Sequence, residues 1–377
     1  MLRRHFTFLT IAATAASAGV VAMTSRPFQD SAHAQTIPNV PTLRAEAESG
    51  NVDAQFRLGK AYQTGSGVAR DDAKAAEWFR KAAEQGNAGA ENSLGIMYSM
   101  GLGVEKNKEE AVNWYRKAAK QGSPDAMFNL GASYYNGEGI AENPVSAYAW
   151  FLLAKEAGST AAVDAVRRSA SELGPRLSPQ AVVQIGDMYE DGNDLPKNYS
   201  EAARWYRKQA DKDPEAAMRL VTLLMNGAGV NRDYGEAMTL CKGAASGNHA
   251  DAQFCVGYLY EHGLGVPANT KEAWKWYTEA APRNAKAALA LSDMYLKGAI
   301  VPVDRAQAFW FLFLAFRNGS LAAKAQAHSL RQELTQDEAK RLAKILKEQH
   351  LDPTKVYAFI DDPNPPESRQ FLPPLVR

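Results

Sequence analysis

Residues 62–79 read YQTGSGVARDDAKAAEWF, and the same pattern returns along the chain. A shift of 36 positions aligns Tyr62 with Tyr98 and Tyr134, and no insertion is needed across these three copies. The same shift aligns further sets, including Gly65, Gly101, Gly137 and Trp78, Trp114, Trp150. Four later copies are marked by Gly192, Gly227, Gly263 and Gly298. Internal repetition at this period predicts a repeat architecture.

The glycine-rich loop of this stretch has two possible interpretations. Such loops often bind phosphate where they open a helix, but glycine also ends helices in the left-handed conformation. The residue that starts the following helix favours the second interpretation, because it is Asp or Asn in all seven copies. These preferred N-caps are Asp71, Asn107, Asn143, Asn198, Asp233, Asn269 and Asp304. Glu or Gln follows three residues later in five copies, as in a capping box. We therefore expect a helix connector rather than a phosphate site.

Helical spacing supports pairs of short helices. Ala54, Leu58 and Tyr62 recur every fourth residue and share one face, and Ala75, Phe79 and Ala82 do the same on the next helix. Helices of about 12 residues are marginal alone, so burial must come from stacking neighbouring units. The repeated unit A-x-x-x-L-G-x-x-Y-x-x-G-x-G-V-x-x-D closely resembles the Sel1-like repeat family, relatives of the tetratricopeptide repeats. The resemblance covers roughly residues 40–345 and implies an all-α, right-handed α-solenoid of about seven helix-turn-helix repeats.

The repeats divide the chain into blocks. We expect three repeats plus an extra helix at 42–176 and four repeats plus C-terminal capping helices at 177–348. The blocks either stack continuously or flex at Gly174-Pro175. A proline-rich tail follows at 349–377, either disordered or an extended segment that binds a partner or folds back on the solenoid.

The first residues indicate export. Arg3 and Arg4 precede an apolar run that ends near Met23, and Ala32-His33-Ala34 offers a small-residue cleavage site. A signal peptide at 1–34, cleaved before Gln35 and followed by a linker at 35–41, predicts a periplasmic or secreted protein with no membrane span. The apolar run is about 18 residues, near the lower edge of a membrane span. A retained inner-membrane anchor is therefore the alternative.

Catalytic and cofactor motifs are missing from the sequence. It contains no S-x-x-K, G-x-S-x-G, H-E-x-x-H or Walker A pattern, and its histidines show no metal-ligand spacing. With 43 basic and 42 acidic residues, the near-neutral chain lacks the basic excess typical of nucleic-acid binding. We predict no enzyme activity, no cofactor and no nucleic-acid partner.

The two cysteines, Cys241 and Cys255, stand fourteen positions apart on neighbouring predicted helices. They form either a disulfide, which an exported protein can acquire, or two buried free thiols. Cysteine-rich Helicobacter members of the Sel1-like group carry disulfides between neighbouring helices, although at a different spacing. Some members of that group are linked to β-lactam binding, but no residue pattern here carries that property over.

A binding surface is expected where the repeats differ from one another. Three positions of each first helix vary between copies and share one face, which in tetratricopeptide-like solenoids lines the concave groove. Ile96 and Met100 are apolar where their counterparts are mostly polar, and Tyr258 and His262 place two rings on this face; each either contacts a partner or fills a local packing gap. Charge varies along the predicted groove, which favours an extended peptide. The candidates are Arg57, Lys60, Ile96, Met100, Asn129, Asn136, Asp187, Asp191, Tyr258 and His262.

The resulting hypothesis is a non-catalytic scaffold, adaptor or regulator that binds a protein or extended peptide in the bacterial envelope. Periplasmic Sel1-like proteins include negative regulators of sensor kinases, so the resemblance is consistent with such a role. The alternatives are an enzyme that acts on cell-wall material or β-lactams, and a membrane-anchored structural organiser.

Overall fold

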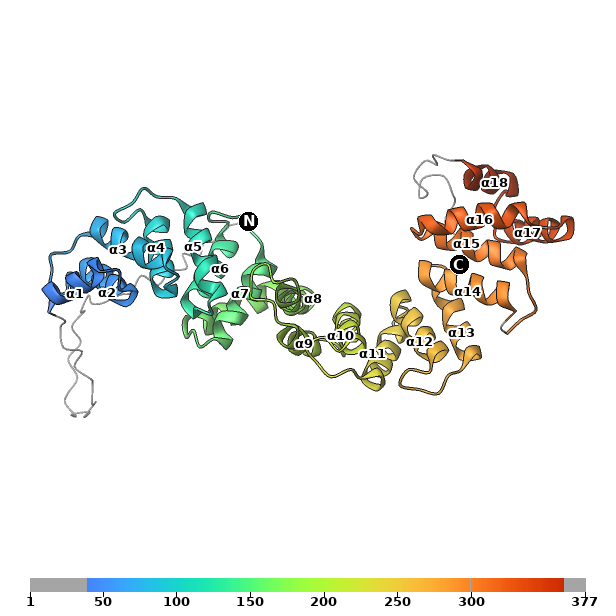
Figure 1. Cartoon of the computed structure of the whole chain (residues 1–377), viewed down its shortest axis with the longest axis horizontal. Coiled ribbons are helices and arrows are strands. Elements are labelled where there is room, and N and C mark those ends of the chain that lie inside the picture. Colours follow the sequence, from blue (N-terminus) through green and yellow to red (C-terminus); the bar gives the residue numbers. More distant parts are fainter. Residues whose placement is uncertain (1–38, 299, 363–377) are drawn as a thin grey trace. The chain divides into compact units, whose positions relative to one another are not determined.

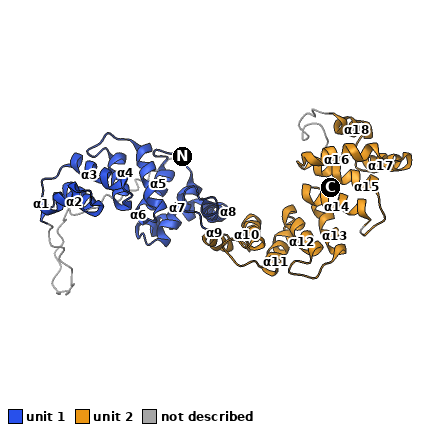
Figure 2. Cartoon of the chain, in the orientation of Figure 1, with its two compact units in different colours: residues 1–198 blue, residues 199–377 orange. Residues whose placement is uncertain are grey.

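The computed structural model describes residues 39–298 and 300–362, and the chain divides into two compact units, 1–198 and 199–377 (Figure 2). All regular elements of the described residues are α-helices, which confirms the predicted all-α class. The predicted signal peptide, most of the linker at 35–41 and the prolines from Pro363 to Pro374 lie outside the described residues.

The helices are short and mostly of equal length (Figure 1). Unit 1 contains α1 (Val40–Glu48), α2 (Val52–Thr64), α3 (Asp72–Glu84), α4 (Ala88–Met100), α5 (Lys108–Lys120), α6 (Pro124–Asn136), α7 (Pro144–Glu156) and α8 (Ala161–Asp191). Unit 2 contains α9 (Tyr199–Arg207), α10 (Pro214–Asn226), α11 (Tyr234–Ser246), α12 (Ala250–His262), α13 (Thr270–Ala280), α14 (Ala285–Lys297), α15 (Arg305–Arg317), α16 (Leu321–Gln332), α17 (Gln336–Glu348) and α18 (Pro353–Asp361).

The predicted N-caps start the second helix of the repeats. The Asp71 side chain accepts a hydrogen bond from the Lys74 backbone N–H at 3.0 Å, and the Asn107 side chain accepts one from Glu110. Asn143, Asp233, Asn269 and Asp304 cap their helices in the same way. A full capping box, in which the side chain three positions on also accepts a hydrogen bond from the N-cap backbone N–H, forms at Thr335 and Glu338. At Asp233 the residue three positions on, Glu236, binds Arg207 instead.

The two glycines of each loop have different roles. Gly65 ends α2 with φ 77° and donates its N–H to the Ala61 carbonyl at 2.8 Å, as expected for a C-terminal cap. The second glycine allows close approach: a Cβ at Gly103 would overlap the carbonyl group of Asp72, in the first turn of α3. Gly139, Gly229 and Gly265 meet the corresponding turns of α5, α9 and α11 in the same way. Each of these loops therefore rests on the preceding repeat.

Helices within a repeat pack through a glycine and an aromatic ring. A Cβ at Gly95 on α4 would lie 2.6 Å from the Tyr115 ring on α5, so the ring lies directly on the α4 backbone. Gly59, Gly131 and Gly257 meet the rings of Phe79, Phe151 and Tyr277 similarly. These rings and the helix-A leucines, such as Leu58 and Leu94, are fully buried. The core of each of these four repeats is thus a ring packed into a gap that only glycine leaves open.

The break in the repeat pattern falls within α8, which is kinked at Gly174 (φ 67°, ψ −177°). Pro175 follows, and a proline ring excludes the preceding residue from helical geometry. The first half of α8 is the predicted extra helix after the third repeat, and the second half is the first helix of the fourth repeat. The expected block boundary at 176/177 thus lies just after this kink, whereas the two compact units meet at 198/199.

The end of unit 2 is more ordered than the predicted tail at 349–377. Residues 353–361 form α18, which begins with Asp352 as N-cap and Pro353 in the first turn, a position that tolerates proline. Val356, Phe359 and Ile360 are buried, and the Phe359 ring packs on Phe316 of α15 at 5.4 Å. Asp361 pairs with Arg331 of α16. This segment thus folds back on the preceding helices, one of the outcomes left open, but as a helix rather than an extended segment, because the remaining prolines follow it.

No helix among residues 39–298 and 300–362 combines the length and the apolar character needed to cross a membrane.

Candidate partner-binding surface

The predicted variable positions lie on the first helix of each repeat, and we call the surface they share the helix-A face. In unit 1 it comprises positions on α2, α4, α6 and the second half of α8; in unit 2 it comprises positions on α10, α12 and α14. Neighbouring first helices touch: the Asn129 amide on α6 donates to the Asn92 amide oxygen on α4 at 3.0 Å, and α12 lies beside both α10 and α14. The positions on α4 and α6 therefore share a surface in unit 1, and those on α10, α12 and α14 share one in unit 2.

The centre of the helix-A face in unit 1 is partly closed. Ile96 is only 8% exposed and Asn129 only 2%, whereas Met100 is 45% exposed and Asn136 is also exposed. The hydrogen bond between Asn129 and Asn92 holds α6 against α4 one turn before Ile96. Ile96 thus has the packing role, one of the two left open by the sequence, and Asn129 is buried rather than solvent-facing. Met100 and Asn136, at the C-terminal ends of their helices, remain accessible.

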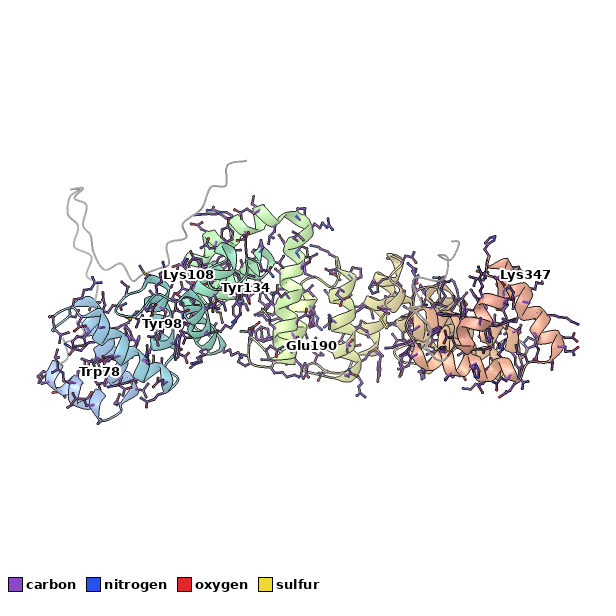
Figure 3. The ribbon with its side chains drawn as sticks, turned by 90° about the horizontal axis from the view of Figure 1, so that it is seen from above. Trp78, Tyr98, Lys108, Tyr134, Glu190 and Lys347 are labelled. Carbon is purple, nitrogen blue, oxygen red and sulfur yellow. A yellow bond between two sulfur atoms is a disulfide. The ribbon has the colours of Figure 1, made fainter. Side chains whose placement is uncertain are left out.

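The predicted charged positions of unit 1 lie on α2 and on the second half of α8. Arg57 and Lys60 on α2 are exposed, and neither forms an ion pair within the described residues; the Lys60 ammonium lies 5.0 Å from the centre of the Phe56 ring. On α8, Asp191 is exposed and also forms no ion pair within that part of the chain, while Asp187 is half-buried. α2 thus carries exposed basic side chains, and the C-terminal end of α8, close to Glu190 (Figure 3), carries acidic ones.

A tyrosine–glutamate contact joins α6 to the first half of α8. The Tyr135 hydroxyl of α6 donates to both carboxylate oxygens of Glu172 on α8, at 2.9 and 3.0 Å. Burial and the neighbouring Glu172 carboxylate raise the pKa of Tyr135 to about 12. The hydroxyl therefore stays a donor and holds Glu172 beside α6. Sequence reasoning missed this pair, because Glu172 lies outside the repeat pattern.

The predicted ring pair in unit 2 is present. Tyr258 and His262 stack with ring centres 4.2 Å apart, and the His262 Nδ1 lies 3.0 Å from the Tyr258 carbonyl oxygen. His262 is exposed and Tyr258 is half-buried against Phe254. The Tyr277 hydroxyl donates to Glu261 at 2.6 Å, and burial together with this carboxylate raises the pKa of Tyr277. Internal contacts thus occupy much of this aromatic group.

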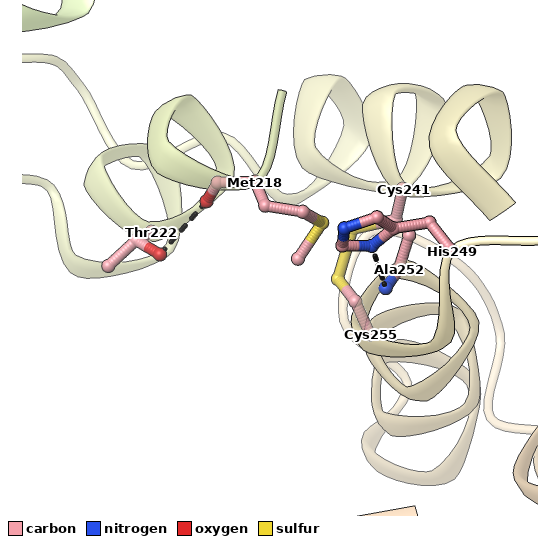
Figure 4. The surroundings of a disulfide bond; sticks show 6 residues. All are labelled: Met218, Thr222, Cys241, His249, Ala252 and Cys255. Carbon is pink, nitrogen blue, oxygen red and sulfur yellow. Dashed lines mark hydrogen bonds between the residues drawn. A yellow bond between two sulfur atoms is a disulfide. The ribbon is translucent and has the colours of Figure 1, made fainter. Parts of the chain in front are cut away.

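The two cysteines form a disulfide, one of the two outcomes left open by the sequence. Cys241 of α11 and Cys255 of α12 have Cα atoms 6.1 Å apart, and both side chains are buried. Figure 4 shows the Met218 side chain of α10 pointing towards this bond. Cys255 occupies one of the variable helix-A positions, but its side chain is used to join two repeats.

A buried carboxylate lies under the helix-A face of unit 1. Glu91 is 4% exposed and accepts a hydrogen bond from the Gln121 side chain at 2.7 Å. Desolvation raises the pKa of Glu91, against the opposing effects of Gln121 and Lys117. One repeat earlier, Gln85 donates to Gln55 at the same distance, with the same sequence separation. The pair therefore joins the first helix of a repeat to the end of the second helix of the same repeat, with either a carboxylate or an amide as acceptor.

The second helices present a different surface, in which cations cover aromatic rings. Lys81, Lys117 and Lys208 place their ammonium groups 3.4–4.0 Å from the ring centres of Trp78, Trp114 and Trp205. Basic side chains also bind a tyrosine hydroxyl eighteen residues later, in the next first helix: the pairs are Arg44–Tyr62, Arg80–Tyr98, Arg116–Tyr134 and Lys242–Tyr260. The tyrosine contacts join successive repeats. Because basic side chains cover both the tyrosine and the tryptophan rings, these rings are less available to a partner than Met100.

Metal-binding chemistry has no visible basis in the described part of the chain. No group of three or more His, Cys, Asp or Glu side chains gathers there in a way that would hold a metal ion.

Comparison with known proteins identifies the repeat. The family profile described as Sel1 repeat matches seven segments, 52–87, 88–123, 124–159, 179–214, 214–249, 250–281 and 285–320. The chain is 36% identical over 124 residues to the chitin synthase regulator SKT5 of Saccharomyces cerevisiae, and 31% identical over 97 residues to the ERAD-associated E3 ubiquitin-protein ligase component HRD3A of Arabidopsis thaliana. These matches cover 32% and 25% of this chain but only 17% and 14% of those proteins.

Solved structures with a similar chain come from bacteria. The c5321 protective antigen of uropathogenic Escherichia coli is 30% identical, with a TM-score of 0.43, over 82% of this chain and 63% of that one. A Sel1 repeat protein from Oxalobacter formigenes is 28% identical, with a TM-score of 0.38, over 77% and 79%. The repeat pattern, the paired helices and the seven profile matches agree: this chain belongs to the Sel1 repeat family.

Proposed function

We propose that the protein is a non-catalytic scaffold that binds another protein through the helix-A face of unit 1. The observation that carries the proposal is the contrast between positions within the repeats. Packing positions repeat from copy to copy, whereas Met100 is exposed on α4, and the neighbouring α2 carries Arg57 and Lys60, exposed charges that form no ion pair among the described residues. Exposed apolar side chains bordered by charge are typical of protein-binding surfaces.

The relatives support a role that depends on a second protein. One is named as a regulator of a synthase and the other as a component of a ligase. The matched segments are small parts of those proteins, so the property proposed for this chain is only that it acts together with another protein.

We also propose that the protein acts in the bacterial envelope, in the periplasm. The signal-peptide pattern at 1–34 supports export, and the buried Cys241–Cys255 disulfide is typical of proteins in oxidising compartments. Mass spectrometry of the protein isolated from the periplasm tests this: an N-terminus at Gln35 is expected, and an intact N-terminus in the membrane fraction would favour the anchored alternative.

Site-specific photo-crosslinking tests the binding role. In intact cells, a photoreactive amino acid in place of Met100 is expected to give one discrete crosslinked band that contains the protein and its partner. The matched control places the same residue at Asn113, which is exposed on α5, the second helix of the same repeat. Equal bands from both positions, or none from Met100, would refute the proposed face. Covalent labelling of the purified protein by a fluorescent penicillin would instead favour the enzyme alternative.

A further inference from the structure

We propose that residues 363–377, which follow α18, bind across Leu321 of α16 in the same molecule. The proposal concerns the end of unit 2 and does not depend on the helix-A face of unit 1.

Leu321 is the most exposed of the large apolar side chains in the described part of the chain, at 78%. It is the first residue of α16, a position that α4, α6, α10, α12 and α14 fill with alanine or proline. A single exposed leucine is common on protein surfaces, so its exposure is not by itself evidence of a contact. The path of the chain beside Leu321 is what distinguishes this residue.

The C-terminal end of α18 follows one side of α16. The Asp361 carboxylate pairs with the Arg331 guanidinium at 2.5 Å and lies 2.9 Å from the His328 Nδ1. The backbone carbonyl of the next residue, Asp362, accepts a hydrogen bond from the Lys324 ammonium. Arg331, His328 and Lys324 are spaced by three and then four residues, so they share one side of α16. Successive contacts thus lie nearer to the start of α16.

Leu321 is the next position on this side of α16, three residues before Lys324. A ring contact indicates the same location independently: Phe359 of α18 packs on Phe316 in the last turn of α15, with ring centres 5.4 Å apart. Because α16 begins at Leu321, shortly after Phe316, the end of α18 lies at the connection between α15 and α16. The chain therefore leaves α18 beside Leu321.

The last described residue and the sequence after it favour a path over Leu321. Asp362 is extended, with φ −66° and ψ 120°, as expected for a residue before proline. Pro363 and the prolines that follow it favour continued extension, at about 3.1 Å per residue. The step from Lys324 to Leu321 along the helix axis is about 4.5 Å. Two or three residues beyond Asp362 are therefore enough to reach Leu321.

The contact is favourable because the segment is already tethered. A proline ring or another apolar side chain placed on Leu321 removes apolar surface from water. α18 holds the start of the segment beside α16, which gives it a high effective concentration. An extended proline-rich chain also has little conformational entropy to lose on binding.

Alkylation of a single thiol tests the contact. The two native cysteines form a disulfide, so Leu321→Cys introduces one free thiol. We expect N-ethylmaleimide to label it about 10-fold more slowly in the full chain than in a chain that ends at Asp362, since a segment bound about nine-tenths of the time leaves about one thiol in ten accessible. Gln326→Cys is the matched control: Gln326 is exposed on the opposite side of α16, so its labelling rate should be the same in both chains.

A crosslink in the full chain identifies the covering segment. A photoreactive amino acid in place of Leu321 should link to a peptide from residues 363–377 within one molecule, whereas the same amino acid in place of Gln326 should not. Absence of this crosslink, or equal labelling of the Leu321→Cys thiol in the full and shortened chains, would overturn the proposal. A crosslink between two molecules would also overturn it, because a second copy would then cover Leu321. Circular dichroism checks the folding of the shortened chain, and the crosslink decides the matter where that chain unfolds.

Discussion

Replacing Gly103 with alanine tests whether each loop really rests on the preceding repeat. Gly103 has φ 65°, and a Cβ there would overlap the backbone carbonyl of Asp72 in the previous repeat. The left-handed backbone costs a side chain about 1 kcal/mol, and relieving an overlap between two backbones costs about 1–3 kcal/mol more. Gly103→Ala should therefore lower the free energy of unfolding of unit 1 by about 2–4 kcal/mol.

Gly122→Ala is the matched control, because Gly122 has φ 86° but no atom within 4 Å of the added Cβ. It should lose only the backbone contribution, about 1 kcal/mol. Thermal unfolding followed by circular dichroism measures both. For a domain of this size, about 2–4 °C per kcal/mol predicts a fall of about 8 °C for Gly103→Ala and about 3 °C for Gly122→Ala. Losses that agree within about 0.5 kcal/mol would show that the loop is not held against α3.

Further predictions concern three other sites. Ile96→Ser should lower the free energy of unfolding by about 2–4 kcal/mol, since it removes a buried side chain, whereas Met100→Ser should change it by less than about 1 kcal/mol; equal losses in denaturant titrations would contradict the separation of core and surface. Glu91→Gln should stabilise the protein at pH 7 by about 1 kcal/mol while keeping the Gln121 hydrogen bond, as in the Gln55–Gln85 pair. Burial raises the pKa of Glu91 above its usual 4.5. The charged carboxylate therefore destabilises the native state as the pH rises above about 4. The gain should therefore disappear below about pH 4, and a variant less stable than the parent at pH 7 would refute this account. Cys241→Ala with Cys255→Ala should cost unit 2 about 3 kcal/mol, as expected for a bridge that spans fourteen residues; a reductant should lower the melting temperature of the parent equally, and an unchanged melting temperature would argue against the bridge.

The fold could be predicted because its causes are local and repeated. Asp71 and its counterparts are recognisable N-caps, and Gly65 is a recognisable helix stop, so helix ends follow from short stretches of sequence. The role of Gly103 was not predictable, since its contact lies in another repeat. The helix at 353–361 was missed because the prolines around it outweighed Val356, Phe359 and Ile360, whose burial depends on α15 to α17.

The candidate surface was less predictable, because variation between repeats does not distinguish exposed from buried positions. Asn129 varies yet pairs with Asn92, and Cys255 varies yet forms a bridge. Met100 lies one turn from Ile96 on the same helix, but only Met100 reaches solvent. The charges of Arg57 and Asp191 were visible in the sequence, whereas the contact between Glu172 and Tyr135 joins residues 37 positions apart, one of them outside the repeat pattern.

The helices at the two ends of the described chain have a consequence for assembly. A stack of similar repeats that ended without cover would expose an apolar end surface able to receive the first repeat of another copy. Such head-to-tail contacts do not close into a ring, and they lead to filaments. Here α1 covers α2 with Leu43 and Ala47, and α18 covers the last helices with Val356, Phe359 and Ile360. The same short helices that complete the core thus oppose end-to-end polymerisation of the protein.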